Sequence, residues 1–184
     1  MAKTLCIELL DRNGDIIKEI CIGKEYLNGE KDDSTYNWVY IIATMFQPVD
    51  SVYLYNTSNE RVLAYFRPVT SSPTFMFTGS RVYISLGADS TPPTVYDYSL
   101  KAKLTEKEVE SVSIDVSSRL VSLTATFIFM SQTTIYEVGL EMDIMAEVGG
   151  TMTKTRILLD RTVISGGITV QASQGLRVTY RFSL

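Results

Sequence analysis

The chain has 184 residues, of which 45% are hydrophobic and 21% are charged, and its 17 basic and 21 acidic residues give a formal net charge of −4. A chain of this length can bury roughly 70% of its unfolded surface, so we expect a single domain over residues 1–184. The two signs of charge are interspersed, which argues against nucleic acid as a partner. No window approaches the ~20 apolar residues of a membrane span, and Glu8 precedes any long apolar run, so we expect neither a membrane span nor a signal peptide.

The first predicted element is a hairpin over residues 4–23, because Asn13-Gly14 separates two apolar runs. Pairing across this turn places Cys6 opposite Cys21, and it also places Glu8 opposite Glu19, which is mildly unfavourable, so a register shifted by one residue is the alternative. If this register forms a hydrogen-bonded pair, the cysteine Cα atoms lie ~5.5 Å apart, within reach of a disulfide. The alternative is two reduced thiols, as expected of a protein made inside a cell.

Residues 35–47 are apolar on nearly every side and are followed by Pro48. Their length favours a buried helix, whereas their β-branched residues favour a central strand. We predict one short helix here, packed with the N-terminal hairpin on the rest of the domain.

Apolar and polar residues alternate along most of the remaining chain, which is typical of strands with one buried face. A polar stretch rich in glycine and proline, 87–100, interrupts them and predicts an ordered loop held against its own domain, with a polyproline ligand as the alternative. A short charged stretch over 106–110 precedes the later strands. The strands before residue 131 are predicted at 52–56, 61–66, 74–78, 81–86, 111–116 and 120–130.

The C-terminal part, 135–184, alternates most regularly. A two-residue Gly149-Gly150 turn sets a register in which Leu140 opposes Leu159, Met142 opposes Ile157 and Asp143 opposes Arg156. We therefore predict a mainly all-β fold, an antiparallel β-sandwich that is jelly-roll-like.

Three carboxylates, Glu137, Glu141 and Asp143, follow one face of this strand and are the best case for an enzyme, since paired carboxylates can cleave glycosidic bonds. We favour a solvated row in which Arg156 and Lys154 neutralise Asp143. The chain contains no histidine, which excludes Ser-His-Asp and Cys-His arrangements, and two cysteines alone cannot complete a zinc site. We expect no enzyme activity, no catalytic residue, no metal and no cofactor.

The chain has eleven tyrosines, a residue type that tolerates a half-wet interface. Ordinary core packing is the alternative for each of them. The candidates for subunit contacts are Tyr53, Tyr55, Tyr65, Tyr83, Tyr96 and Tyr98.

Four segments carry a resemblance to a known group of proteins. They are Tyr-Ile-Ser-Leu-Gly at 83–87 with Thr-Pro-Pro-Thr-Val-Tyr-Asp-Tyr-Ser-Leu at 91–100, Ile-Tyr-Glu-Val-Gly-Leu at 135–140, Leu-Leu-Asp-Arg-Thr-Val at 158–163, and Ile-Thr-Val-Gln-Ala-Ser-Gln-Gly-Leu-Arg-Val-Thr-Tyr at 168–180. This order resembles small β-rich, virion-associated proteins encoded by tailed phages (bacteriophages) and archaeal viruses.

The resemblance implies a structural part of a virus particle and no enzymatic residues. We therefore expect an accessory or minor virion component, such as a capsid decoration, turret or tail-associated subunit. Its expected partners are copies of itself, because uncovered sheet edges find cover in neighbours, and the major capsid or tail protein. The alternative is a carbohydrate-binding, receptor-binding module that uses exposed tyrosines.

Overall fold

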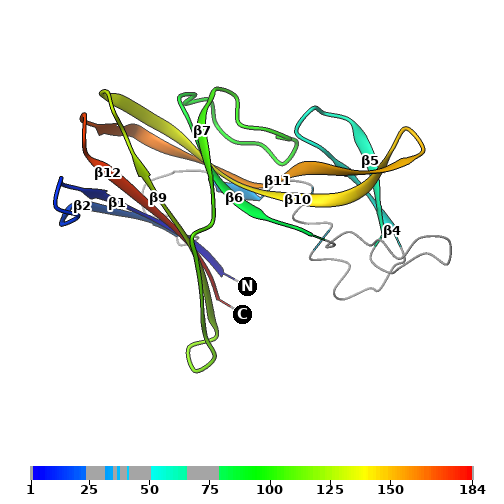
Figure 1. Ribbon diagram of the computed structural model, residues 1–184, viewed down its shortest axis with the longest axis horizontal. Helices are drawn as coiled ribbons and strands as arrows, with labels where there is room; N and C mark the ends of the chain where they lie inside the picture. The colour runs from blue at the N-terminus through cyan, green and yellow to red at the C-terminus, as the bar shows by residue number, and fades with distance from the viewer. Residues whose placement is uncertain are drawn as a thin grey trace.

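The computed structural model describes residues 2–23, 32–34, 37, 41, 51–65 and 79–183. These residues form two antiparallel β-sheets that pack against each other as a sandwich (Figure 1). The strands are β1 (Ala2–Leu10), β2 (Ile16–Gly23), β3 (Asp32–Ser34), β4 (Ser51–Tyr55), β5 (Arg61–Tyr65), β6 (Val82–Gly87), β7 (Lys103–Glu108), β8 (Ser111–Asp115), β9 (Leu120–Ile128), β10 (Thr133–Val148), β11 (Thr151–Val170) and β12 (Gly175–Ser183).

The first sheet has the order β2-β1-β12-β9-β8. Its first and last strands in the chain, β1 and β12, pair along their whole length, so the two ends of the described chain lie side by side (Figure 1). The second sheet has the order β3-β11-β10-β5-β4, with β6 and β7 added beside β10. The long hairpin of β10 and β11 forms the middle of this sheet and fixes the positions of the shorter strands.

One hydrophobic core lies between the sheets. Leu5, Tyr180 and Val178 contribute to it from the first sheet, and Val138 and Ile144 contribute from the second, all with no exposed surface. Alternate residues of a strand point to opposite faces, so the regular alternation in the sequence accounts for this layer. The all-β sandwich predicted from the sequence is confirmed.

The N-terminal hairpin forms in the predicted register. Cys6 pairs with Cys21 and Glu8 pairs with Glu19. The cysteines are joined by a disulfide, so the alternative of two reduced thiols is wrong for this structure. Their Cα atoms are 4.1 Å apart, which is shorter than predicted and closer to the spacing of a non-hydrogen-bonded pair. Glu8 is stabilised by Arg177 on β12, at 2.9 Å, a partner that the hairpin alone could not reveal.

The Gly149-Gly150 turn is also confirmed, with Met142 opposite Ile157 and Asp143 opposite Arg156. The prediction that Leu140 opposes Leu159 is wrong, because Leu140 pairs with Asp160. A β-bulge between Leu140 and Glu141 inserts one extra residue into β11, and a turn-based register cannot anticipate such an insertion.

The other predicted elements have mixed outcomes. The charged stretch 106–110 was not predicted as a strand, yet most of it belongs to β7, whose partner β6 supplies the apolar residues that the stretch lacks. The strand predicted at 74–78 lies outside the described residues. Of the helix predicted over 35–47, only Asn37 and Ile41 are described, so this element also lies outside the described part of the chain.

Candidate functional site

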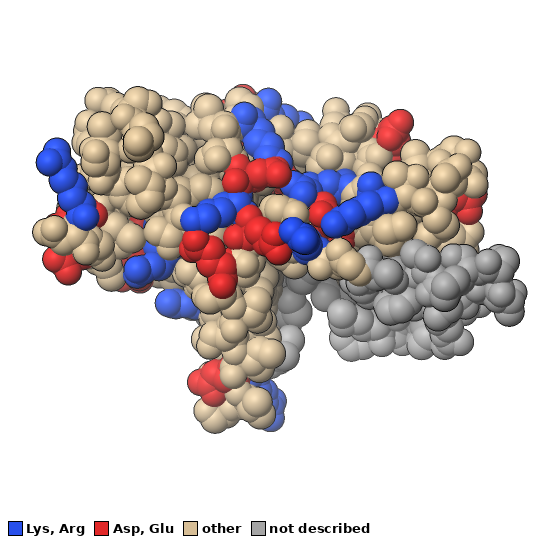
Figure 2. Space-filling model, in the orientation of Figure 1, with Lys and Arg blue, Asp and Glu red and all other residues tan. Residues whose placement is uncertain are grey.

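One strongly exposed apolar feature of the described residues is a hairpin formed by β8 and the start of β9. We call residues 111–124 the arm. In Figure 1 the arm is the green hairpin that projects below the two sheets, well clear of the body of the sandwich. Figure 2 shows it as mainly uncharged, with an acidic and a basic side chain near its tip.

One face of the arm continues the core-facing side of the first sheet. Val112 lies opposite Leu123, which in turn lies opposite the buried Tyr180 of β12. In the neighbouring row, Ile114 lies opposite Val121, which lies opposite the buried Phe182. Directly opposed residues of paired strands share a face, so these apolar side chains all point to the inner side of the sandwich.

The inner face of the first sheet is buried within the sandwich but is exposed along the arm. Tyr180 has no exposed surface, whereas Val112 is 61% exposed and Ile114 is 68% exposed. Val116, in the turn after β8, is 82% exposed. We call Val112, Ile114 and Val116, with the partly buried Val121 and Leu123, the arm row. Among the described residues, the arm row is an inner sheet face that no second sheet covers.

The outer edge of the arm is also open. β8 is the last strand of its sheet, and no described strand pairs with its free side. Sheet edges are commonly protected by lysine, proline or a bulge, but residues 111–114 of β8 are Ser-Val-Ser-Ile. Asp115 is the single charge of the strand, and it is occupied with its own turn, accepting hydrogen bonds from the amides of Ser117 and Ser118. The Ser117 hydroxyl also donates to this carboxylate, and the side-chain and backbone hydrogen bonds of Ser117 and Ser118 together hold the pKa of Asp115 well below its ordinary value.

A shallow groove of about 580 Å³ runs beside the base of the arm, between β7 and β9. Its exposed apolar residues are Leu104, Ile128 and Met130. Lys107 donates a hydrogen bond of 2.7 Å to the carbonyl of Thr126 at one side of this groove. Ile128 follows the buried Phe127 in β9, so it points to the face opposite the arm row, and the groove is a separate apolar surface.

The predicted interface tyrosines separate into three groups. Tyr53, Tyr55 and Tyr65 lie on the outer face of the β4–β5 hairpin, where Arg61 stacks on the Tyr53 ring at 3.7 Å and Tyr65 donates a hydrogen bond to Glu147. Tyr83 is instead covered by Arg156, whose guanidinium lies 3.6 Å from the ring centre.

Tyr96 and Tyr98 belong to the loop between β6 and β7 and meet Tyr55 at a pocket of about 260 Å³. Tyr96 is 78% exposed, so one wall of this pocket is an open aromatic surface. The other described residues that line it are Asn37, Asn59 and Asp97. The structure therefore brings together three of the six predicted tyrosines.

The acidic row on β10 differs from the expectation. We predicted a solvated row, but Glu137 has no exposed surface, Glu141 is 1% exposed and Asp143 is 7% exposed. The loop 88–102 contacts this face of the sheet, and the three carboxylates are neutralised by Arg156 and Arg161 of β11 and by Lys103 of β7. Figure 2 shows the resulting band of acidic and basic side chains across the middle of the molecule.

Arg161 of β11 is the centre of this buried arrangement. Its Nε donates to Glu137 at 2.6 Å and its Nη1 donates to Asp97 and to the carbonyl of Thr91, both at 3.0 Å. Glu137 also accepts the backbone amides of Lys101 and Ala102. Arg161 and Glu137 thus fasten the loop 88–102 to the sheet, as predicted for a loop held against its own domain.

Asp143 has the two predicted cationic partners, Arg156 at 2.8 Å and Lys154 at 3.2 Å. Burial raises the pKa of Asp143, but the hydrogen bonds and charges of these two cations outweigh it and lower that pKa overall. A general acid must hold a proton near neutral pH, and an Asp with a lowered pKa does not. The arrangement favours a structural role for this carboxylate.

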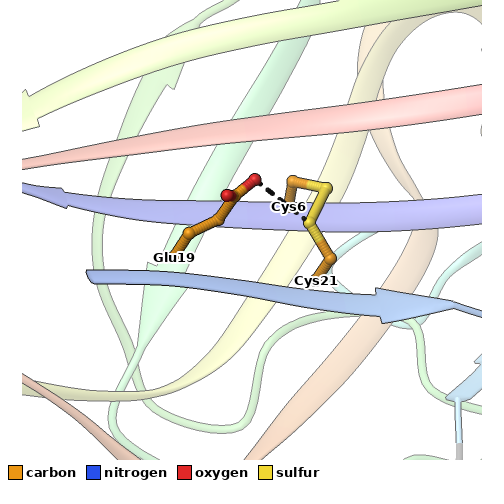
Figure 3. Close-up of side chains that lie close together, drawn as sticks. All are labelled: Cys6, Glu19 and Cys21. Carbon is orange, nitrogen blue, oxygen red and sulfur yellow. Dashed lines mark hydrogen bonds between the residues drawn. A yellow bond between two sulfur atoms is a disulfide. The ribbon is translucent and has the colours of Figure 1, made fainter. Parts of the chain in front are cut away.

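The disulfide lies at the other end of the first sheet, close to Glu19 (Figure 3). Cys6, Cys21 and Glu19 place three atoms of metal-ligating type within 4.8 Å of one another. A disulfide sulfur is neither a thiolate nor a proton donor, so the 3.5 Å approach of Glu19 Oε1 to Cys21 Sγ is a contact and not a metal site or a true hydrogen bond. The disulfide instead fixes the register of β1 and β2.

The arm row was missed as a site in the sequence, although its strands were predicted. A usable signal was present, since Ser-Val-Ser-Ile-Asp is a strand without an edge-protecting charge among its first four residues.

The described residues include no helix long and apolar enough to cross a lipid bilayer. Comparison with known protein families, with curated proteins and with solved structures finds no match to this chain.

Proposed function

We propose that the protein is a structural subunit of a virus particle, an accessory component that assembles with copies of itself and docks on a capsid or tail. The observation that carries the assembly part of this proposal is the arm row. A sheet face built like a core, but left without a covering layer, is stabilised when another molecule covers it.

The magnitudes support an interface. Fully burying one Val or Ile side chain is worth about 1.5–3 kcal/mol. Three largely exposed side chains of one arm therefore supply a few kcal/mol, against an association cost of about 4–15 kcal/mol. An apolar partner surface of similar size is needed before binding becomes favourable.

The body of the molecule has the properties of a rigid support. Its two sheets are joined by the buried ion pair between Lys3 and Asp160, and the loop 88–102 is fastened by Arg161. A disulfide adds a covalent link between β1 and β2. Such a scaffold resists deformation and suits a protein that holds neighbours in place. The virion assignment itself rests on the resemblance of residues 83–180 to phage and archaeal-virus proteins.

The experiment that tests this proposal is quantitative mass spectrometry of virus particles purified from the source of the chain. We expect the protein in intact particles at a copy number that is a small-integer ratio to another structural protein. The protein should also remain with particles through a density gradient. Its presence only in the lysate, and not in particles, would contradict the proposal.

A carbohydrate-binding function is a second candidate because of the pocket at Tyr55, Tyr96 and Tyr98. Aromatic faces stack on the apolar faces of sugar rings, and a pocket of about 260 Å³ accommodates a single ring. Asn59, at the rim, is exposed and has an amide that can bind hydroxyl groups.

A glycan array tests this second candidate, with Tyr96→Ala as the disrupting variant and Tyr53→Ala as the control. Tyr53 is also exposed but lies outside the pocket. Glycan binding that Tyr96→Ala abolishes and Tyr53→Ala preserves would support it. An array without binding, or equal losses in both variants, would reject it.

A further inference from the structure

Lys3 and Asp160 meet in the interior of the sandwich, where water has little access. Lys3 comes from β1 in the first sheet and Asp160 comes from β11 in the second, and the two side chains are in direct contact, each less than a tenth exposed. The Lys3 Nζ also lies 6.0 Å from the centre of the Tyr180 ring, which is buried and stacks on Phe182. The amine nitrogen and the carboxyl carbon are therefore held together in largely apolar surroundings.

The other lysines of the described residues that bind buried carboxylates have much more access to water. Lys101, Lys103 and Lys154 form such pairs, but their side chains are 34–47% exposed. Water keeps an ammonium group protonated, and a protonated amine has no electron pair with which to attack a carbon atom. At Lys3, burial disfavours the charged forms, so the transfer of one proton from Nζ to Asp160 gives an amine and a carboxylic acid at little cost.

Thr162 orients the carboxyl group of Asp160. Its hydroxyl donates a hydrogen bond of 3.1 Å to Oδ2, whereas Lys3 contacts Oδ1. One carboxyl oxygen thus faces the amine and the other faces a hydrogen-bond donor. When a nucleophile adds to a carboxyl carbon, negative charge develops on the oxygen that stays, and a donor placed there stabilises the transition state.

We propose that Lys3 and Asp160 condense into an intramolecular amide, an isopeptide bond between β1 and β11. After one proton has moved from Nζ to Oδ1, the electron pair of Nζ attacks Cγ, and the π electrons of the Cγ–Oδ2 bond move to Oδ2. A second proton then passes from Nζ to Oδ1. The Cγ–Oδ1 bond breaks with its electrons on the departing water molecule, and the Oδ2 carbonyl forms again. The reaction releases one water molecule and needs no oxidant, reductant or other co-reactant.

Folding provides the contact that the reaction requires. Amines and carboxylic acids do not condense in dilute solution in water, but groups held in the right geometry react with effective molarities of about 10⁵–10⁸ M. The newly folded chain therefore holds the ion pair, and the bond forms afterwards. It links residues that are 157 positions apart and joins one sheet covalently to the other. This inference goes beyond the proposed function and does not depend on it.

Mass spectrometry of the full chain, reduced and denatured, tests the bond. We expect the purified wild type to be lighter than the mass calculated from its sequence by one water molecule. The Lys3→Arg variant keeps the positive charge but has no attacking amine, so it should have its full calculated mass. A wild type at its full calculated mass would overturn the inference.

Trypsin digestion of the same wild-type sample locates the bond and requires no variant to fold. An amide at Lys3 blocks cleavage there, so the peptide that ends at Arg12 should be joined to the peptide 157–161. Recovery of these two peptides as separate species, whatever the mass of the full chain, would also overturn the inference. Absence of the protein from virus particles would contradict the proposed function and leave the bond unaffected.

The rate of water loss tests Thr162 as a positioning residue. The fraction of chain that has lost water is followed by mass from the time of synthesis in cell-free translation. We expect Thr162→Val to slow the loss by about a hundredfold and Thr162→Ser, which restores the hydroxyl, to stay within about threefold of the wild type. Circular dichroism checks that both variants are folded. Equal rates in the wild type and Thr162→Val would overturn the role of Thr162.

Discussion

Lys3 on β1 and Asp160 on β11 form a buried ion pair that joins the two sheets of the sandwich. Lys3 is 8% exposed and Asp160 is 3% exposed, and Thr162 also donates a hydrogen bond to Asp160. The Lys3 ammonium lies 6.0 Å from the centre of the Tyr180 ring, which belongs to the core. A charge pair in this position is costly to break, because each member has little access to water.

We predict that, relative to the ion-paired wild type, Lys3→Met lowers the free energy of unfolding by about 3–5 kcal/mol, because it removes the Lys3 ammonium from the buried Asp160 carboxylate. The double variant Lys3→Met/Asp160→Leu should recover much of this loss, since it removes both charges. Urea unfolding followed by circular dichroism measures both effects. A loss below about 1 kcal/mol, the size typical of a surface pair, would show that the pair is hydrated in solution.

Gly139 of β10 lies against Leu100 of the loop 88–102. A Cβ atom at residue 139 would lie 2.2 Å from Cδ1 of Leu100, which is buried. We therefore expect Gly139→Ala to cost about 1–3 kcal/mol of stability through overpacking.

Shortening the opposing side chain provides the control for this prediction. The Leu100→Ala background removes the 2.2 Å contact and leaves Cδ1 of Leu158 at 3.2 Å from the added methyl group, so Gly139→Ala should then cost clearly less than in the wild type. Equal costs in both backgrounds would show that the Gly139 effect comes from strand propensity and not from Leu100.

Removing the disulfide should destabilise the protein without changing its fold. The Cys6–Cys21 link has a sequence separation of 15 residues, and a loop of that size corresponds to about 3 kcal/mol in the chain-entropy description. The Cys6→Ala/Cys21→Ala variant should have a free energy of unfolding that is lower by about 3 kcal/mol, and its urea midpoint should therefore be lower. An unchanged midpoint, with the disulfide shown by mass spectrometry to be present in the wild type, would contradict the prediction.

Acid should weaken the ion pairs that hold the loop 88–102 and strand β7 beside β10. At Asp97 and Glu106 burial raises the pKa, but hydrogen bonds from Lys101 to Asp97 and from Lys103 to Glu106, with neighbouring charges, lower the pKa overall. The pKa of Asp143 is lowered in the same way. A group with a depressed folded-state pKa contributes stability that is fully present above its unfolded pKa and is lost as the pH falls through the folded value.

The ordinary values are 3.8 for Asp and 4.5 for Glu, so stability should fall progressively below about pH 4.5. Urea titrations at pH 7, 5, 4 and 3 measure this dependence. Asp143→Asn should be less stable than the wild type at pH 7 and should lose less stability between pH 5 and pH 3. A wild-type stability that is constant over this range would contradict the assignment of ionised, paired carboxylates.

Much of the sheet could be predicted because strand alternation and turn residues are local properties. The register of Cys6 with Cys21 and of Asp143 with Arg156 both follow from two-residue turns. The bulge that displaces Leu140 could not be predicted, since it depends on how β11 accommodates its neighbours. The burial of Glu137 and Glu141 also depends on a distant loop. The alternation of a strand is the same whether its polar side chains face water or Arg161, so this burial could not be predicted from the sequence.

The candidate site was harder to predict than the fold for a related reason. The side chains of Val112 and Ile114 follow the same alternation as those of Val178 and Tyr180, and the sequence does not indicate where one sheet extends beyond the other. Tyr55, Tyr96 and Tyr98 share a pocket, whereas Tyr83 is covered by Arg156, and a role of these tyrosines in subunit contacts stays a prediction.

The most direct test of the central claim is the mass of the unmodified protein in solution, measured by light scattering over a hundredfold range of concentration. The chain has a mass of 20.6 kDa. If the arm row joins copies of the protein, the measured mass rises with concentration to twice that value or to a higher multiple. A mass that stays at 20.6 kDa throughout the range would contradict the claim that the arm holds neighbouring copies together.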